Sequence, residues 1–97
     1  MGMFNPPHPG EFISATYLNP CKMTGRFLAT KLGVAASTLN RILKLQSGVS
    51  PEMALRLSKT LGRTPESWLA MQDAYDLWVA KKETDLSKLK PLDLTVV

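Results

Sequence analysis

The sequence predicts an all-α fold in which five helices are followed by a short C-terminal tail. Apolar residues recur at helical spacing through most of the chain. Residues suited to start a helix precede these segments, and glycine or proline follows them. The chain has 97 residues, of which 44% are hydrophobic and 21% charged. It is therefore long enough for one domain with a compact core, and its composition is unlike that of a disordered protein.

The first helix is expected from Pro9 to about Asn19. Proline suits the first helical turn, and Glu11 suits the positive end of the helix dipole. Pro20 closes the helix and is followed by a loop. We assign residues 1–8 to an N-terminal extension, in which His8 leads into the helix and is not a catalytic base.

The next two helices are separated by one tight turn. Thr24 is a good N-cap for the second helix, and Gly33 lies where a left-handed residue would end it. The third helix should cover about residues 35–45 and end at Gln46-Ser47-Gly48. Two short helices joined in this way predict a helix-turn-helix, the motif that holds one helix against DNA.

The fourth and fifth helices share a start signal. Ser50-Pro51-Glu52 and Thr64-Pro65-Glu66 each combine a capping hydroxyl, a proline and an acid. The fourth helix should stop at Gly62, and the fifth should span residues 65–82. Residues 83–97 then form the tail.

The third helix collects its polar residues on one narrow face. At about 100° per residue, four polar side chains share an arc of roughly 100° opposite the branched aliphatic residues: Ser37, Asn40, Arg41 and Lys44. Small residues precede them, and a slim N-terminal end is what a helix needs to enter the major groove. Arginine can bind guanine and asparagine can pair with adenine. The candidates for base contacts are therefore Ser37, Thr38, Asn40 and Arg41.

The start of the second helix is a candidate phosphate clamp. Thr24, Gly25 and Arg26 offer backbone amides and a cation at the positive end of a helix. Lys44 is a further phosphate candidate. From Lys22 to Arg63 the chain carries eight basic residues against one acidic residue, a concentration of positive charge that favours a polyanionic partner. An ordinary amphipathic helix with a solvated basic surface is the alternative.

The fifth helix has a wider apolar arc than one core needs. The arc spans about 200°, and a helix with one buried face needs little more than half of that. Gln72, Asp73 and Asp76 occupy the solvated side. We expect the excess to form a homodimer interface, because helix-turn-helix repressors are commonly two-fold dimers; deep burial in a small domain is the alternative. The candidate interface residues are Trp68, Met71, Tyr75, Trp78 and Val79.

The sequence contains no recognisable catalytic or phosphate-binding motif. It has no glycine-rich phosphate loop and no Ser/His/Asp or Cys/His set. Its single cysteine, Cys21, excludes an internal disulfide, and we expect it to be semi-buried in a loop. No apolar run approaches the ~20 residues of a membrane span, and the N-terminus lacks the regions of a signal peptide. We therefore expect a cytoplasmic protein that is not an enzyme and that binds no metal or cofactor.

Four segments carry a family resemblance: His8-Pro9-Gly10-Glu11, LATKLGVAASTLNRIL (28–43), SPEMALRLSKTLG (50–62) and TPESWLAMQDAYDLW (64–78). Over about residues 8–80 they make the sequence similar to the HigA family of toxin–antitoxin antitoxins, within the XRE/Cro-like helix-turn-helix class. The resemblance implies a five-helix, lambda-repressor-like DNA-binding domain (Cro/C1-type, residues 9–82) that dimerises. It also implies repression at a palindromic operator in the chain's own operon and neutralisation of a HigB-like toxin that cleaves mRNA.

The resemblance also assigns roles by position. Ala36, Ser37 and Arg41 match base-reading positions, and Thr24 to Arg26 match the phosphate-clamping start of the preceding helix. Residues 44–48 (KLQSG) depart from the family, since many relatives have an Asn-Gly-Arg-like turn there. Two other functions stay open: a free-standing transcriptional regulator of the same fold without a toxin, and a helical protein-interaction module.

Overall fold

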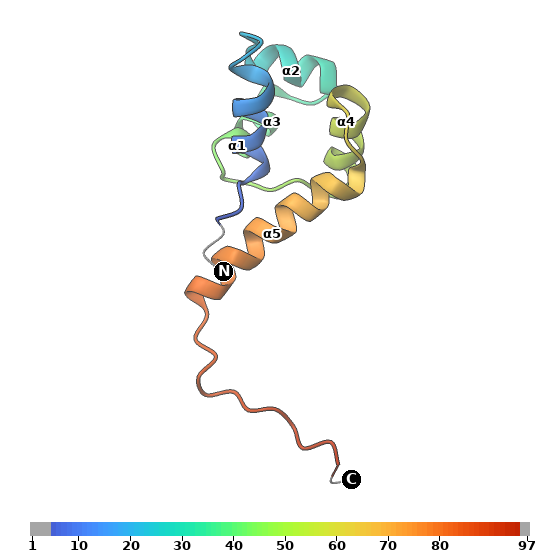
Figure 1. Ribbon diagram of the computed structural model, residues 1–97. Helices are drawn as coiled ribbons and strands as arrows, with labels where there is room; N and C mark the ends of the chain where they lie inside the picture. Colours follow the sequence, from blue (N-terminus) through green and yellow to red (C-terminus); the bar gives the residue numbers. More distant parts are fainter. Residues whose placement is uncertain (1–4, 96–97) are drawn as a thin grey trace.

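Five α-helices and one π-helical segment make up the fold (Figure 1). The computed structural model describes residues 5–95, so residues 1–4 of the predicted N-terminal extension and residues 96–97 of the tail lie outside it. In chain order the elements are α1 (Pro9–Ile13), the π-helical η1 (Ser14–Leu18), α2 (Gly25–Leu32), α3 (Ala36–Leu43), α4 (Pro51–Leu61) and α5 (Pro65–Glu83). Residues 5–95 contain no strand, which confirms the all-α prediction.

The core lies between α1, α2, α3 and α4, and α5 closes it from one side (Figure 1). Trp68 of α5 is completely buried, and its indole Nε1 donates a hydrogen bond to the Gly62 carbonyl at 3.0 Å. This bond satisfies the one polar group of a large buried side chain. The other largest fully buried side chains within residues 5–95 are Pro9, Ile13, Leu28, Leu39 and Leu57.

The crossing of α1 over the end of α3 requires a glycine. A Cβ atom on Gly10 would lie 2.9 Å from the carbonyl carbon of Ile42 and 3.1 Å from the Cα of Leu43. These are backbone atoms, which cannot turn aside as a side chain could. Gly10 therefore sets how closely α1 packs against the C-terminal end of α3.

The predicted helix starts are confirmed by hydrogen bonds. The hydroxyls of Thr24, Ser50 and Thr64 accept the backbone amides of Phe27, Met53 and Ser67 at 3.1, 3.2 and 3.0 Å. Each hydroxyl occupies one of the amides that a helix leaves without an internal partner.

His8, expected to lead into the first helix, is the N-cap of α1. Its Nδ1 accepts the Gly10 amide at 2.9 Å, and its own amide donates to the Glu11 carboxylate at 3.1 Å. The imidazole is buried, edge-on to the Tyr75 ring at a centroid distance of 4.9 Å. Burial lowers the pKa of His8 from its usual value, against smaller opposing effects of Asp76, Glu11 and the Ser47 backbone.

Two expectations about polar residues were wrong. Gln72, expected in solvent, is only 7% exposed; its Oε1 accepts the Val49 amide and its Nε2 donates to Asp76, both at 2.9 Å. Helical periodicity predicted a solvent-exposed position for Gln72, but its hydrogen bond to Val49 links the segment before α4 to α5. Cys21, expected to be semi-buried, is exposed in the turn before α2.

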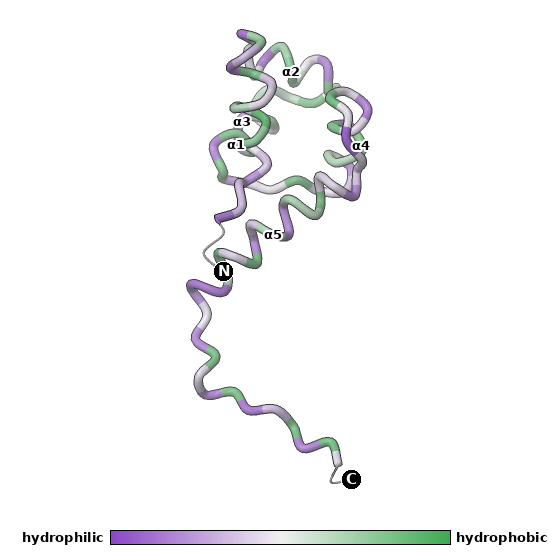
Figure 2. The backbone as a smooth tube through the Cα atoms, in the orientation of Figure 1, coloured by the Kyte–Doolittle hydropathy of each residue, from purple (hydrophilic) through white to green (hydrophobic). Residues whose placement is uncertain are grey.

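Residues 84–95 leave the end of α5 as an extended, exposed tail. Hydrophobic and hydrophilic positions alternate along it (Figure 2). The radius of gyration is 17.3 Å, compared with about 12.5 Å expected for a compact chain of this length, because the tail projects from the helices. No helix within residues 5–95 has both the length and the apolar character needed to cross a membrane.

Candidate nucleic-acid interface

The turn between α2 and α3 is held by a closed set of backbone hydrogen bonds. Gly33 adopts a left-handed conformation (φ +73°), its amide donates to Thr30 at 3.1 Å and the Val34 amide donates to Ala29 at 3.0 Å. This is the Schellman pattern that ends a helix at glycine. Arg56 of α4 adds a hydrogen bond of 2.9 Å to the Leu32 carbonyl. The two helices are thus fixed at one angle.

The first turns of α2 and α3 face a common hollow of about 340 Å³. Five predicted site residues line it together with Leu43: Gly25, Arg26, Ala36, Ser37 and Asn40. Phosphate candidates from α2 and base-reading candidates from α3 therefore meet on one surface. Gly25 adds no side chain to this surface; a Cβ atom there would lie 3.2 Å from Leu43 Cδ1, the movable end of a side chain.

The N-terminus of α3 differs from the other α-helix starts. Ala35 precedes it and, within residues 5–95, no side chain caps it, whereas α1, α2, α4 and α5 each receive a side-chain hydrogen bond. The amides of Ala36 and Ser37 therefore remain at the positive end of the helix with only small side chains around them. This end can approach an anionic surface closely.

The C-terminal end of α3 makes the same kind of turn as α2 but without glycine. Leu45 takes the left-handed conformation (φ +64°), and the Gln46 amide donates to the Arg41 carbonyl at 2.8 Å. Although residues 44–48 differ from the family pattern, they still form a Schellman turn. The turn places a non-glycine residue, Leu45, in the strained left-handed region of backbone conformation.

The remaining predicted residues lie in two places. Thr24, Arg41 and Lys44 are exposed at the start of α2 and at the C-terminal end of α3, but they do not line the hollow. Thr38 is half-buried on another side of α3, where it lines a second hollow with Ser50 and Glu52 of α4. Thr38 is thus separated from the other base-reading candidates.

Comparisons with known proteins agree with this geometry. The helix-turn-helix family HTH_3 matches residues 15–69. Antitoxin HigA-1 of Vibrio cholerae is 33% identical over 89 residues, which cover 90% of this chain and 84% of the relative. The chain belongs to the HigA family of helix-turn-helix proteins.

Other relatives and solved structures are at least as similar. An uncharacterised helix-turn-helix transcriptional regulator of Escherichia coli K12, YddM, is 37% identical over 92 residues, covering 95% of this chain and 97% of YddM. The solved structure of antitoxin GraA is 39% identical and superposes with a TM-score of 0.86, covering 92% of this chain and 99% of GraA. The predicted five-helix fold is thereby confirmed.

Two basic residues of this HigA-family chain, Arg56 and Arg63, have structural roles away from the hollow. Arg56 pairs with Glu52 at 2.9 Å, in addition to its bond to α2. The Arg63 guanidinium lies 5.0 Å from the centroid of Phe12 and 5.8 Å from that of Trp68. The positive charge counted along the sequence is therefore only partly available to a polyanion. The Glu52–Arg56 pair is four residues apart within α4, a spacing that the sequence displays. The bond from Arg56 to Leu32 and the contacts of Arg63 depend on packing between elements, and the sequence gave no signal for them.

One of the predicted dimer-interface residues is excluded by its burial. Trp68 is completely buried in the core of its own chain, so it cannot contact a second copy. Met71, Tyr75, Trp78 and Val79 are half-buried. The angular argument identified a broad apolar arc but centred it on the side of α5 that the core covers.

Proposed function

We propose that this chain is the antitoxin of a HigB/HigA-type operon. In this proposal it is a cytoplasmic, non-enzymatic protein that needs no cofactor or metal. It binds a palindromic operator in its own operon as a homodimer, represses that operon, and neutralises an mRNA-cleaving, HigB-like toxin. The observation that carries the DNA-binding part is the hollow where the first turns of α2 and α3 meet. The structure of GraA with its operator supports it, at 38% identity and a TM-score of 0.82 over 95% of this chain and 96% of GraA.

In this proposal α3 and α2 make different kinds of contact with DNA. The uncapped end of α3 enters the major groove, where Ser37, Asn40 and Arg41 reach base edges. Gly25 and Arg26 meet a phosphate through free backbone amides and a guanidinium. Phosphate contacts position the protein, and base contacts select the sequence.

Gel shifts with the DNA upstream of the encoding operon test this arrangement. Arg41→Ala should weaken binding by about 5- to 150-fold and relax specificity at one base pair, since a bidentate base contact is worth about 1–3 kcal/mol. Arg26→Ala should weaken binding to all sequences and lower the salt slope by about one. Lys59→Ala, which removes the same charge from an exposed site on α4, is the matched control.

Two results, obtained together, would remove the DNA-binding hypothesis. They are an affinity that does not change across a salt series and an Arg41→Ala variant that binds as the wild type does. Such results would favour the third function, a helical protein-interaction module.

The toxin partner is tested separately by co-purification with the product of the adjacent small gene. Recovery of a stable complex, and rescue of growth when that gene is induced, support the antitoxin function. The likeness to YddM favours the second candidate, a free-standing regulator. Operator binding without any toxin partner would establish it.

A further inference from the structure

A single side chain of α4 holds the carbonyl end of α2. The Nη1 atom of Arg56 donates to the Leu32 carbonyl at 2.9 Å and to the Gly33 carbonyl at 3.3 Å. The last carbonyls of a helix lack a partner inside it and carry partial negative charge, so a guanidinium suits them. Only Val34-Ala35 separates these carbonyls from the start of α3. Arg56 therefore binds the helix-turn-helix at the residues that lead into α3.

Glu52 fixes the direction of the Arg56 guanidinium. Its Oε2 accepts from Nε at 3.2 Å and from Nη2 at 2.9 Å, which leaves Nη1 to face α2. Because the guanidinium is a rigid plane, holding two of its nitrogens also determines where the third points. The Glu52 side chain is 75% exposed, so the ion pair itself contributes little to stability. Its main effect is to aim Nη1 at the turn.

Arg56 lies on a side of α3 that does not face the hollow between α2 and α3. It lines the smaller hollow of about 160 Å³ with Val34 and Thr38, and the two hollows share no lining residue. The C-terminal end of α2 lies beside α4 (Figure 1). Any effect of Arg56 on DNA binding therefore passes through the turn and not through a direct contact.

The first turn of α3 depends on this link. Within residues 5–95 no side chain caps α3, and its buried residues, Leu39 and Ile42, lie beyond the first turn. A binding site requires its side chains to be held within about 0.5 Å and about 10–20° of the productive geometry. If the turn could shift against α4, the base-reading side chains of α3 would move together away from that geometry.

We propose that Arg56, oriented by Glu52, is a positioning residue for operator recognition: it fixes the turn between α2 and α3 to α4 and holds α3 at the angle that base contacts require. The inference rests on the proposed function, because it assigns a role in DNA binding to a residue that does not touch DNA. Loss of Arg56 should weaken operator binding more than binding to unrelated DNA, since non-specific binding depends on phosphate contacts.

Equilibrium binding of the full chain to two duplexes tests this role. One duplex is the DNA upstream of the encoding operon, and the other has the same bases in shuffled order. The ratio of the two affinities should fall about tenfold for Arg56→Lys and about threefold for Glu52→Ala, because displaced base contacts are each worth about 5- to 150-fold. Lysine keeps the charge of Arg56 but lacks its planar fork. The dependence on salt should stay that of the wild type, because no phosphate contact is lost.

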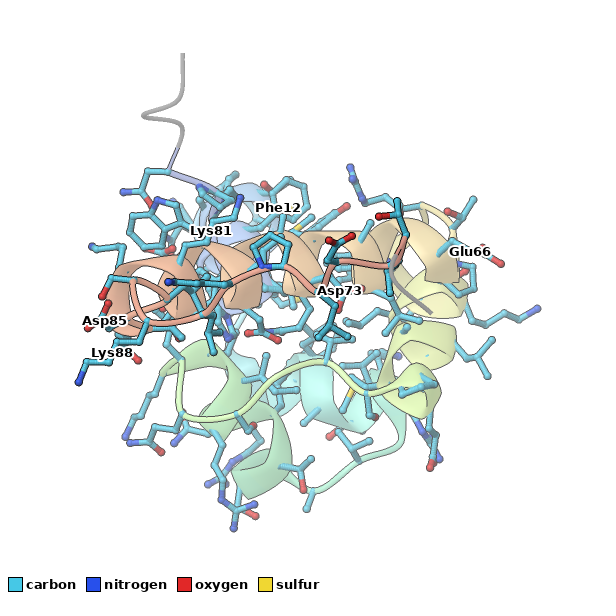
Figure 3. All side chains as sticks on the ribbon, turned by 90° about the horizontal axis from the view of Figure 1, so that it is seen from below. Phe12, Glu66, Asp73, Lys81, Asp85 and Lys88 are labelled. Carbon is cyan, nitrogen blue, oxygen red and sulfur yellow. The ribbon has the colours of Figure 1, made fainter. Side chains whose placement is uncertain are left out.

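Glu66→Ala is the matched control for Glu52→Ala. Glu66 occupies in α5 the position that Glu52 occupies in α4, after a capping hydroxyl and a proline. It lies at the exposed start of α5 (labelled in Figure 3), and among residues 5–95 it forms no ion pair. Its replacement removes the same charge from a helix start without releasing Arg56, so the affinity ratio should stay that of the wild type.

Circular dichroism at the binding temperature separates positioning from stability. A residue that only stabilises the fold lowers Tm but leaves the affinity ratio of the folded protein unchanged, and this result for Arg56→Lys overturns the inference. So does an equal loss of affinity for both duplexes with a salt slope lowered by about one, which identifies a phosphate contact.

Two other outcomes are distinct from these. A loss of the affinity ratio in Arg56→Lys but not in Glu52→Ala refutes the orienting role of Glu52. Because Glu52 is exposed, its variant should fold and be measurable even if Arg56→Lys is unstable. A wild-type chain that does not distinguish the two duplexes overturns the proposed function, and this inference with it.

Discussion

Replacing Gly10 by alanine should destabilise the protein, although the same change in most helices is favourable. Alanine is normally preferred over glycine inside a helix by up to about 1 kcal/mol. At Gly10 the added Cβ atom meets the backbone of Ile42 and Leu43 at 3.1 Å or less. Overpacking against immobile atoms costs about 1–3 kcal/mol, and contacts this short correspond to the upper end of that range. Subtracting the helix gain of about 1 kcal/mol leaves an expected net loss of about 2 kcal/mol in the free energy of unfolding.

Thermal and urea unfolding followed by circular dichroism measure this loss. For a domain of this size, 1 kcal/mol shifts Tm by about 4–8 °C, so Gly10→Ala should lower Tm by about 10 °C. Gly25→Ala is the matched control, because it adds a Cβ atom to the first turn of α2 but meets only Leu43 Cδ1 at 3.2 Å, the movable end of a side chain. Its Tm should be unchanged or slightly higher. A Gly10→Ala variant at least as stable as the wild type would refute the argument that the α1–α3 crossing requires glycine.

Three further predictions concern residues that hold the site in place. The pKa of His8 is lower in the folded protein than its ordinary value of 6.5, so its contribution to stability is complete above about pH 6.5 and is lost as the pH falls through the lower, folded-state pKa. Urea unfolding between pH 8 and pH 5 should show this loss, and His8→Asn, which keeps a capping side chain without a proton to gain, should flatten the curve. Gln72→Leu leaves the buried Val49 amide unpaired and should lower the free energy of unfolding by about 1–3 kcal/mol. The control is Gln46→Leu, a change at an exposed position, which should alter that free energy by less than about 0.5 kcal/mol. Equal losses in the two variants would contradict the role of Gln72. Leu45→Gly should raise stability by up to about 1 kcal/mol, because glycine adopts the left-handed conformation without strain. Lys44→Gly, at a position with negative φ, should lower stability. A fall in both variants would show that the packing of the Leu45 side chain contributes more than its backbone strain costs.

Local chemistry made most of the fold predictable. Thr24, Ser50 and Thr64 cap their helices as expected, and Gly33 ends α2 in the left-handed conformation. Such signals act within four or five residues, so a sequence displays them directly. The meeting of α2 and α3 around one hollow follows from the same signals, because a short, fixed turn leaves two helices few relative positions.

Long-range contacts explain what the sequence did not reveal. Gln72 is buried by a hydrogen bond to Val49, 23 residues away, and a periodicity argument cannot anticipate such a partner. Leu45 adopts a conformation that glycine usually supplies, so no residue type announced the turn. On α5, hydrophobic residues occupy both faces, and only the packed structure decides that Trp68 faces inward and Leu77 outward.

The missing cap on α3 shows where selection for stability and selection for function would diverge. A serine in place of Ala35 would add about 1 kcal/mol through a hydrogen bond to the first turn. That hydroxyl would cap the end of α3 that the proposed function places, uncapped, in the major groove. Directed evolution for heat resistance alone should therefore select a substitution of Ala35 by a capping residue at an early stage. The same selection combined with repression of a reporter gene should leave it unchanged.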